Sequence, residues 1–351
     1  MKTFAEFLRE RSYSKIVVIV DELTKQHCLP ILKKGLTAHF PSPGGAQERF
    51  AKWHLIEIPS GEVNKNLDTC ELIWEQLMDL EVDRNGLVIN LGGGVIGDMG
   101  GFCASTFKRG IHFVQVPTTL LSQVDASIGG KLGIDFARVK NSVGVFNDPQ
   151  AVFIDPVFLQ TLSDREIRSG FAEVIKHSLI ADREQWEYIK TIESLESVDW
   201  AKILVPSLSI KKRVVEADPF EHGLRKSLNF GHTIGHGIEG VLLESASPLL
   251  HGEAIAIGMI CESYLSGKVL GLDELSLNEI AQFILRIYGK EELYDSDFSQ
   301  MISLMRKDKK NQDARINFTM LKQPGESLIN QTSKEAAIVE SMRYYNQLVT
   351  V

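Results

Sequence analysis

Short apolar runs alternate with amphipathic segments through the first half of the chain. Residues 15–20 read KIVVIV and residues 87–91 read LVINL, and runs with so little polar interruption are typical of strands buried on both faces of a sheet. Residues 66–80 instead carry apolar side chains at helical spacing, which predicts a helix with one buried face. The same patterns predict strands at 54–58, 114–116 and 151–154 and helices at 24–34 and 98–107. This alternation predicts a doubly wound parallel sheet with ligand sites at the carboxyl ends of its strands.

Helical periodicity takes over after about residue 162. The segments predicted as helices lie near residues 163–181, 199–217, 226–243, 252–271, 275–288, 297–310 and 333–348. Residues 315–321, which read RINFTML, alternate like a lone strand. We therefore predict two domains, an α/β domain at residues 1–158 and a mainly helical domain at residues 159–351.

A glycine-rich sequence follows the strand at 87–91. Residues 92–97 read GGGVIG and fit the G-x-G-x-x-G pattern, in which glycines let the backbone approach a phosphate at the N-terminus of a helix. A tight turn without a ligand explains this motif, taken by itself, about equally well. Gly100 and Gly101, further along the same helix, are either weak points or sites of close packing.

The sugar contacts of a dinucleotide are harder to find in this sequence. In most dinucleotide folds a carboxylate roughly 20 residues after the glycines binds the ribose. This chain has no such carboxylate, because residues 112–119 hold no acid. Asp21, at the end of the first strand, could bind a ribose or could cap the helix that follows. Thr118 and Thr119 end the strand at 114–116, and their hydroxyls could contact a ribose or a phosphate.

The composition is that of an ordinary globular protein with a net charge of -8. The acidic balance argues against nucleic-acid binding. The 4 cysteines include no C-x-x-C pair, so we expect buried thiols in a reducing cytoplasm. The first residues lack the apolar core of a signal peptide, and no apolar run reaches transmembrane length. We therefore expect a cytoplasmic protein without a membrane partner.

Three histidines lie within twenty residues of one another. His232 and His236 are four residues apart, which places both imidazoles on one face of a helix, and His251 opens the next predicted helix. Two of them, with Glu173 from the first helix of this half, could form a divalent metal site of three ligands that leaves a position open for substrate. A lone histidine on a helix is usually a core or surface residue, so it is the cluster that points to a metal site. The H-E-x-x-H pattern is absent, which excludes that class of metalloprotease site.

Several cations sit beside small or polar residues at segment ends. In an acidic chain they could line one pocket for an anion, although most lysines are solvated on helix faces. These cations are Lys131, Lys140, Lys176, Lys211, Arg225 and Lys310, and the polar partners available to them are Asp125, Glu221 and Asn229.

Together these motifs resemble the 3-dehydroquinate synthase family, from about residue 15 to the C-terminus. The matching stretches are 92–98 (GGGVIGD), 116–131 (VPTTLLSQVDASIGGK), 140–141 (KN), 172–176 (AEVIK), 223–236 (GLRKSLNFGHTIGH) and 251–259 (HGEAIAIGM). The resemblance implies an N-terminal Rossmann-like NAD-binding domain and a C-terminal all-helical metal-binding domain. It also implies conversion of 3-deoxy-D-arabino-heptulosonate 7-phosphate to 3-dehydroquinate and phosphate, in the shikimate pathway of aromatic amino acid biosynthesis. In that reaction NAD⁺ is reduced and reoxidised in each turnover, and a Zn²⁺ or Co²⁺ ion takes part.

The resemblance also implies roles for single residues. The metal ligands would be Glu173, His232 and His251. The NAD⁺ contacts would be Asp21, Glu62, Lys65, Gly93, Gly94, Asp98, Thr118, Thr119, Lys131 and Lys140. The substrate contacts would be Arg109, Asp125, Asn141, Lys211, Arg225, Asn229, His236 and Lys310 (or its neighbour Lys309). The residues nearest the chemistry would be Glu221, His236, Lys131, Asp125 and Lys176.

Arg109 matches an arginine that reaches into a neighbouring subunit, which implies a homodimer.

Two other enzyme classes remain open. A metal-dependent NAD polyol or alcohol dehydrogenase would need the cofactor and metal sites but not the cations. Another sugar phosphate cyclase would take a neutral sugar phosphate, whereas Arg225 and Asn229 favour a substrate with a carboxylate.

Overall fold

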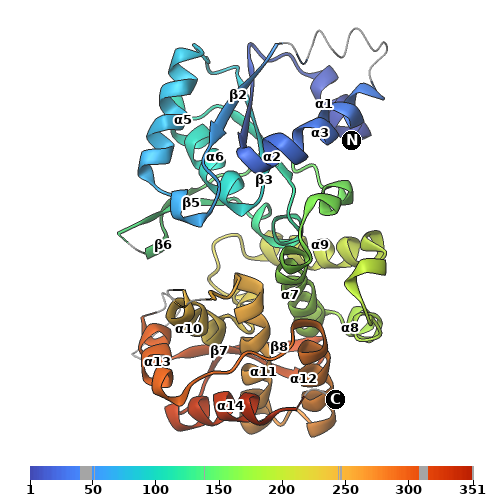
Figure 1. The fold of residues 1–351 in the computed structure, drawn as a ribbon, viewed down its shortest axis with the longest axis vertical. Coiled ribbons are helices and arrows are strands. Elements are labelled where there is room, and N and C mark those ends of the chain that lie inside the picture. Colours follow the sequence, from blue (N-terminus) through green and yellow to red (C-terminus); the bar gives the residue numbers. More distant parts are fainter. Residues whose placement is uncertain are drawn as a thin grey trace. The chain divides into compact units, whose positions relative to one another are not determined.

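The computed structural model describes residues 1–39, 50, 52–137, 139–243, 245, 247–307 and 315–349. The chain divides into two compact units, Met1–Ser163 and Asp164–Val351 (Figure 1). Among the described residues, no helix is long and apolar enough to cross a membrane.

The first unit is built on a parallel sheet of four strands, β1 (Ile16–Asp21), β2 (Trp53–Ile58), β3 (Leu87–Gly92) and β4 (His112–Pro117). Their order is β2-β1-β3-β4. The strands at 15–20, 54–58, 87–91 and 114–116 are therefore confirmed. The prediction of a strand at 151–154 is wrong. Val152 makes only an isolated parallel bridge to Gln115, because the chain soon turns into a short 3₁₀ helix at Pro156–Thr161.

Helices cover both faces of this sheet (Figure 1). One face packs against α5 (Leu67–Asp79) and α6 (Gly94–Thr106), and the other against α1 (Lys2–Glu10) and α3 (Leu29–Thr37). Side chains alternate along β1, so that Val17 and Ile19 face the first pair while Val18 and Val20 face the second. The single helix expected at 24–34 is two helices, α2 (Glu22–His27) and α3, since Pro30 in the first turn of α3 cannot continue a preceding helix.

A β-hairpin that the sequence patterns did not predict extends from this unit. β5 (Lys131–Phe136) and β6 (Val139–Phe146) are antiparallel. Leu132 and Ile134 of β5 join the core beside α6, whereas β6 is exposed along almost its whole length. The hairpin is therefore anchored mainly through β5, and β6 adds only the half-buried Val145 to the core.

The second unit is mainly helical. Its helices are α7 (Asp164–Ala181), α8 (Arg183–Ile189), α9 (Trp200–Ala217), α10 (His232–Leu242), α11 (His251–Leu270), α12 (Glu274–Tyr288), α13 (Phe298–Arg306) and α14 (Glu335–Gln347). The nearly all-buried α11 packs against α7, α10, α12 and α14. The strand expected to be alone pairs with a second strand, so β7 (Asn317–Gln323) and β8 (Glu326–Thr332) form an antiparallel hairpin. α8 was not predicted, and the helix expected at 226–243 is a 3₁₀ turn, Leu224–Asn229, followed by α10.

Candidate active site

The carboxyl ends of β1 to β4 bring the predicted cofactor residues of the first unit to one edge of the sheet. α6 begins at Gly94, four residues earlier than expected, and no side chain caps its N-terminus. A Cβ added to Gly93 would lie 3.0 Å from Thr119 Cγ2, so the glycine lets these two segments meet. A small hollow there is lined by Gly92, Gly93, Gly94, Gly97, Asp98, Gln115, Pro117, Ser122, Ala126 and Ser127. Uncapped helical N–H groups at a glycine-lined hollow fit a dinucleotide phosphate.

Asp21 caps α2. Its Oδ1 accepts a hydrogen bond from the Thr24 backbone N–H at 2.7 Å, and its own N–H donates to Thr24 Oγ1 at 2.9 Å. The next residue, Glu22, accepts hydrogen bonds from the Ser60 backbone N–H and hydroxyl. The loop after β2, which carries Glu62, is thereby tied to the end of β1. Glu22 was missed from the sequence because its partner comes from a distant segment.

Lys65, in the loop after β2, is hydrogen-bonded both to α6 and to β6. Its buried ammonium donates to Asp98 Oδ2 and to Asn141 Oδ1, both at 2.7 Å. Asn141 is held in turn by Asp135, which accepts from its backbone N–H at 2.7 Å. Burial raises the pKa of Asp98 to about 6, although Lys65 opposes that rise. Burial also works against the charge on Lys65, but Asp98 and Glu62 outweigh it and raise the pKa of the ammonium.

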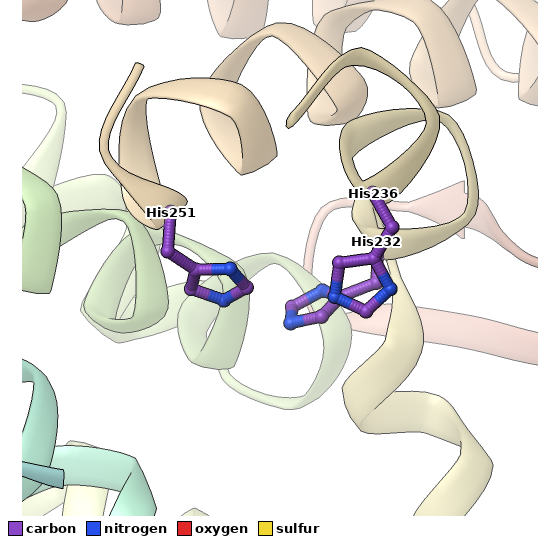
Figure 2. Close-up of side chains that lie close together, drawn as sticks. All are labelled: His232, His236 and His251. Carbon is purple, nitrogen blue, oxygen red and sulfur yellow. The ribbon is translucent and has the colours of Figure 1, made fainter. Parts of the chain in front are cut away.

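The three predicted histidines of the second unit form one cluster. His232 and His236 project from α10 and His251 from the start of α11, and the rings face a common space (Figure 2). The ring centroids are 5.2 Å apart for His232 and His236, 5.4 Å for His232 and His251, and 5.6 Å for His236 and His251. One nitrogen from each ring lies within 4.8 Å of the others, a spacing that one metal ion can bridge.

Neighbouring acceptors orient two of these rings. His232 Nδ1 lies 3.1 Å from the Phe230 carbonyl oxygen, and His251 Nδ1 lies 3.1 Å from Glu239 Oε2. A carbonyl or an ionised carboxylate only accepts hydrogen bonds, so each Nδ1 carries the proton. The lone pair of each ring is then on Nε2, the arrangement typical of metal-binding histidines. Glu239 was missed from the sequence, although it follows His232 and His236 at helical spacing.

Glu173 adds a carboxylate to the histidine cluster. It is fully buried on α7, and its Oε1 lies 3.5 Å from His232 Nε2. That oxygen has no hydrogen-bond partner among the described residues, while Oε2 accepts from the Lys176 ammonium. An unpaired buried carboxylate oxygen is costly unless a cation meets it. Imidazole nitrogens with one carboxylate oxygen suit Zn²⁺ or Co²⁺, so these residues fit the implied metal.

The second unit also buries three cationic side chains on neighbouring elements. Lys176, Lys211 and Arg225 are 1%, 5% and 2% exposed, and α7 and α9 both pack against the 3₁₀ turn that holds Arg225. Arg225 donates to the Pro219 carbonyl at 2.6 Å. Buried cations of this kind need hydrogen-bond or charge partners, and Lys176 has one in Glu173.

Two further predicted residues of this unit lie on the same loop. Asn229 Nδ2 donates to Glu221 Oε1 at 2.8 Å, and Glu221 has a left-handed backbone with φ 62°. The hydrogen bond from Asn229 thereby holds one carboxylate oxygen of Glu221. Lys310 and Lys309 lie outside the described residues.

Arg109 lies away from the other predicted residues of the first unit. It ends a short 3₁₀ turn before β4, at the opposite end of the strand from Thr118. With Arg84, His112 and Asn147 it lines a cavity of about 470 Å³. Thus Arg109 is at the amino ends of the strands, whereas Asp98 and Thr119 are at the carboxyl ends.

Family models confirm the resemblance noted in the sequence. The model of the 3-dehydroquinate synthase N-terminal domain matches residues 55–169, and that of the C-terminal domain matches residues 170–311. The chain belongs to the 3-dehydroquinate synthase family. A 3-dehydroquinate synthase from Parabacteroides distasonis is 39% identical over 345 residues, covering 97% of this chain and 94% of the relative. One from Clostridium beijerinckii is 43% identical over 283 residues, 80% of each chain.

Solved structures confirm the two-part α/β and helical fold. ValA, a 2-epi-5-epi-valiolone synthase from Streptomyces hygroscopicus with NAD⁺ and Zn²⁺ bound, has a TM-score of 0.82 and 25% identity, covering 97% of this chain and 92% of ValA. A 2-deoxy-scyllo-inosose synthase complexed with carbaglucose-6-phosphate, NAD⁺ and Co²⁺ has a TM-score of 0.79 and 24% identity, covering 97% and 94%. A glycerol dehydrogenase from Schizosaccharomyces pombe shares the fold at a TM-score of 0.65 and 14% identity, covering 98% and 86%.

Proposed function

We propose that this enzyme is a carbon–oxygen lyase that converts 3-deoxy-D-arabino-heptulosonate 7-phosphate to 3-dehydroquinate and phosphate. The full-length similarity to 3-dehydroquinate synthases carries this proposal. The free, buried cysteines support a reducing cytoplasm as its location.

The first domain, residues 1–158, would bind NAD⁺ at the carboxyl edge of the sheet. Gly93, Gly94 and the N-terminus of α6 would hold the pyrophosphate. The remaining contacts would come from Asp21, Glu62, Lys65, Asp98, Thr118, Thr119, Lys131 and Lys140. NAD⁺ bound there would supply reversible hydride transfer, so that none would be consumed. ValA, with NAD⁺ bound, supports this assignment.

The second domain, residues 159–351, would bind one Zn²⁺ or Co²⁺ ion through Glu173, His232 and His251. The unpaired Glu173 oxygen and the oriented Nε2 atoms support this ligand set. A divalent ion bound there would act as a Lewis acid that stabilises negative charge on a substrate oxygen. His236, on the exposed side of the cluster, would instead contact the substrate phosphate.

Three cationic side chains on neighbouring elements of the second unit support a substrate that carries negative charge. Arg225 and Asn229 would hold the carboxylate, because a guanidinium and an amide both donate to it. Lys211, Asn141 and Lys310 would hold the remaining polar groups. Asp125, Lys131, Lys176 and Glu221 would stand nearest the reacting carbons, with Glu221 as a proton acceptor. In this arrangement the chain mainly positions the substrate and stabilises charge.

A homodimer completes the proposal. The β5–β6 hairpin exposes four apolar side chains, Phe136, Val139, Val143 and Phe146, with exposed fractions of 55%, 50%, 40% and 56%. A cluster of exposed apolar side chains on one hairpin favours a protein interface. Arg109, at the other end of β4 from the cofactor edge, would contact the phosphate in the partner's site.

Phosphate release tests the function directly. Purified enzyme with the heptulosonate phosphate, zinc and a trace of NAD⁺ should release many phosphates per NAD⁺, with no NADH accumulating. Formation of one NADH per product would instead indicate a dehydrogenase. Turnover of a neutral sugar phosphate in preference to the keto acid would indicate another cyclase. Either result would overturn the proposed reaction.

A further inference from the structure

The N-terminus of α10 is capped by a residue from another helix. Glu262 of α11 is fully buried, and its two carboxylate oxygens accept hydrogen bonds from the backbone N–H groups of Gly231, at 2.7 Å, and Ile234, at 3.0 Å. These amides lie on either side of His232. The first N–H groups of a helix have no partner within it, and the N-cap residue, Gly231, has no side chain to supply one. Glu262 therefore takes the place of the missing cap.

The charge of Glu262 suits this position. A buried carboxylate is costly unless hydrogen bonds and opposite charge compensate it. Here two backbone donors and the positive end of the α10 dipole do so. Because both oxygens are engaged by backbone amides, Glu262 is not itself placed as a metal ligand. It lies eleven residues after His251 on the same helix, about 16 Å along the axis.

Glycines bring α10 and α11 into direct contact along the part of α11 that lies between His251 and Glu262. A Cβ added to Gly258 would lie 2.0 Å from the Gly231 carbonyl oxygen, and one added to Gly235 would lie 3.0 Å from Ile255 Cα. Further along, Glu239 of α10 meets His251 of α11. The contacts run in opposite directions along the two helices, so the pair is antiparallel. Glu262 fixes one end of this register and the Glu239–His251 contact fixes the other.

We infer that Glu262 is a positioning residue for the metal centre: it holds the backbone on both sides of His232 and so fixes this imidazole relative to His251. The inference rests on the metal site of the proposed function. A purely structural role for Glu262 predicts a loss of stability and nothing else. A positioning role predicts a loss of zinc affinity beyond what the loss of stability explains.

Zinc affinity of the Glu262→Gln variant separates these roles. Glutamine keeps the size of the side chain, but its NH₂ group faces a backbone N–H where an oxygen is needed. We expect the zinc dissociation constant of the full-length apo protein, measured by competition with a chromophoric chelator, to rise about tenfold or more, in the range found for outer-shell partners of metal ligands. No NAD⁺ or substrate is needed for this measurement.

Ile260→Ala is the matched control, because Ile260 is fully buried on the same helix and its side chain has no polar group. It should lower the melting temperature of the apo protein at least as much as Glu262→Gln while leaving zinc affinity within about twofold. Ser263→Ala, which removes a buried hydroxyl without a hydrogen-bond partner among the described residues, should change neither quantity.

Three results would overturn the inference. Wild-type zinc affinity in a folded Glu262→Gln variant would exclude positioning, and an equal loss of affinity in Ile260→Ala would reduce the effect to stability. If Glu262→Gln does not fold, Glu262→Asp, whose shorter side chain reaches at most one amide, decides the question by the same measurement. A wild-type protein that binds no zinc would refute the proposed metal site itself, and this inference with it.

Discussion

At Asp98, burial and charge act in opposite directions. The carboxylate forms an ion pair with Lys65, yet burial still raises its pKa to about 6. A group with this pKa changes its charge just below neutral pH. If Asp98 accepts a hydrogen bond from NAD⁺, cofactor affinity depends on the ionised form.

The affinity of the wild-type protein for NAD⁺ should therefore fall as the pH drops through about 6, by up to tenfold per pH unit. Lys65→Met removes the cation that lowers the pKa of Asp98, so the fall should begin at a higher pH. Titration calorimetry between pH 5 and 8 measures both curves. Asp98→Asn is the control and should give a flat profile. A flat wild-type profile would show that Asp98 does not contact the cofactor in its ionised form.

Among the clustered histidines, ring spacing alone does not separate ligands from substrate contacts. We expect His251→Ala to lose bound zinc, as measured by metal analysis after dialysis, because it removes a clustered imidazole whose Nδ1 is held by Glu239. His236→Ala should keep its zinc and should instead raise the KM for the phosphorylated substrate. Full zinc occupancy in His251→Ala, or zinc loss in His236→Ala, would reassign the ligands.

The sequence predicted these histidines but not their partners. Helical spacing was sufficient to put His232 and His236 on one face of α10. The contact between Glu239 and His251 depends on how α10 packs against α11, and nothing in a single helix encodes that packing. The same holds for Glu262, whose role appears only when the two helices meet.

Between elements, Gly100 shows why the glycine-rich helix α6 needs its glycines. The sequence left open whether Gly100 and Gly101 weaken the helix or allow close packing. Added Cβ atoms would lie 2.1 Å from Asn90 Oδ1 and 2.6 Å from Leu132 Cδ2, respectively. Both glycines are therefore sites of close packing, against β3 and β5.

Gly100→Ala should lower the free energy of unfolding. The alanine gains about 1 kcal/mol in helix propensity, whereas overpacking costs about 1–3 kcal/mol. A contact of 2.1 Å with Asn90 Oδ1 places the cost toward the upper end of that range, so the variant should be less stable by up to about 2 kcal/mol. Asn90→Ala removes the clashing amide, whose polar atoms have no partner among the described residues. Urea unfolding of the two single variants and the double variant should show that Asn90→Ala rescues Gly100→Ala. Simple additivity would contradict this packing explanation.

Strands that are buried on both faces could be predicted from the sequence, whereas exposed strands could not. β1 and β3 are buried on both faces and read as continuous apolar runs. β6 is exposed at almost every position, so its sequence carries no alternation that could identify it. β8 likewise mixes exposed and half-buried positions, and its pairing with β7 decides its structure.

At the scale of the whole molecule, Arg109 lies far from the proposed cofactor residues of its own subunit. It lies at the amino ends of the strands beside Arg84 and His112, whereas the residues proposed for NAD⁺ in its own subunit gather at the carboxyl ends. A guanidinium suits bidentate binding of a phosphate. In a two-fold dimer each subunit would supply this arginine to the other's site.

Mixed dimers test this exchange. Arg109→Ala and His232→Ala homodimers should each be nearly inactive, the first without its phosphate contact and the second without a metal ligand. In a heterodimer one site carries both defects and the other carries neither. When equal amounts of the two variants exchange subunits at random, about half of the dimers are heterodimers, and one of their two sites is intact. The mixture should therefore regain about a quarter of wild-type activity. Phosphate release from the remixed subunits gives the measurement, and differently tagged chains show that heterodimers have formed. No recovery despite heterodimer formation would mean that Arg109 acts within its own subunit or has no part in the reaction.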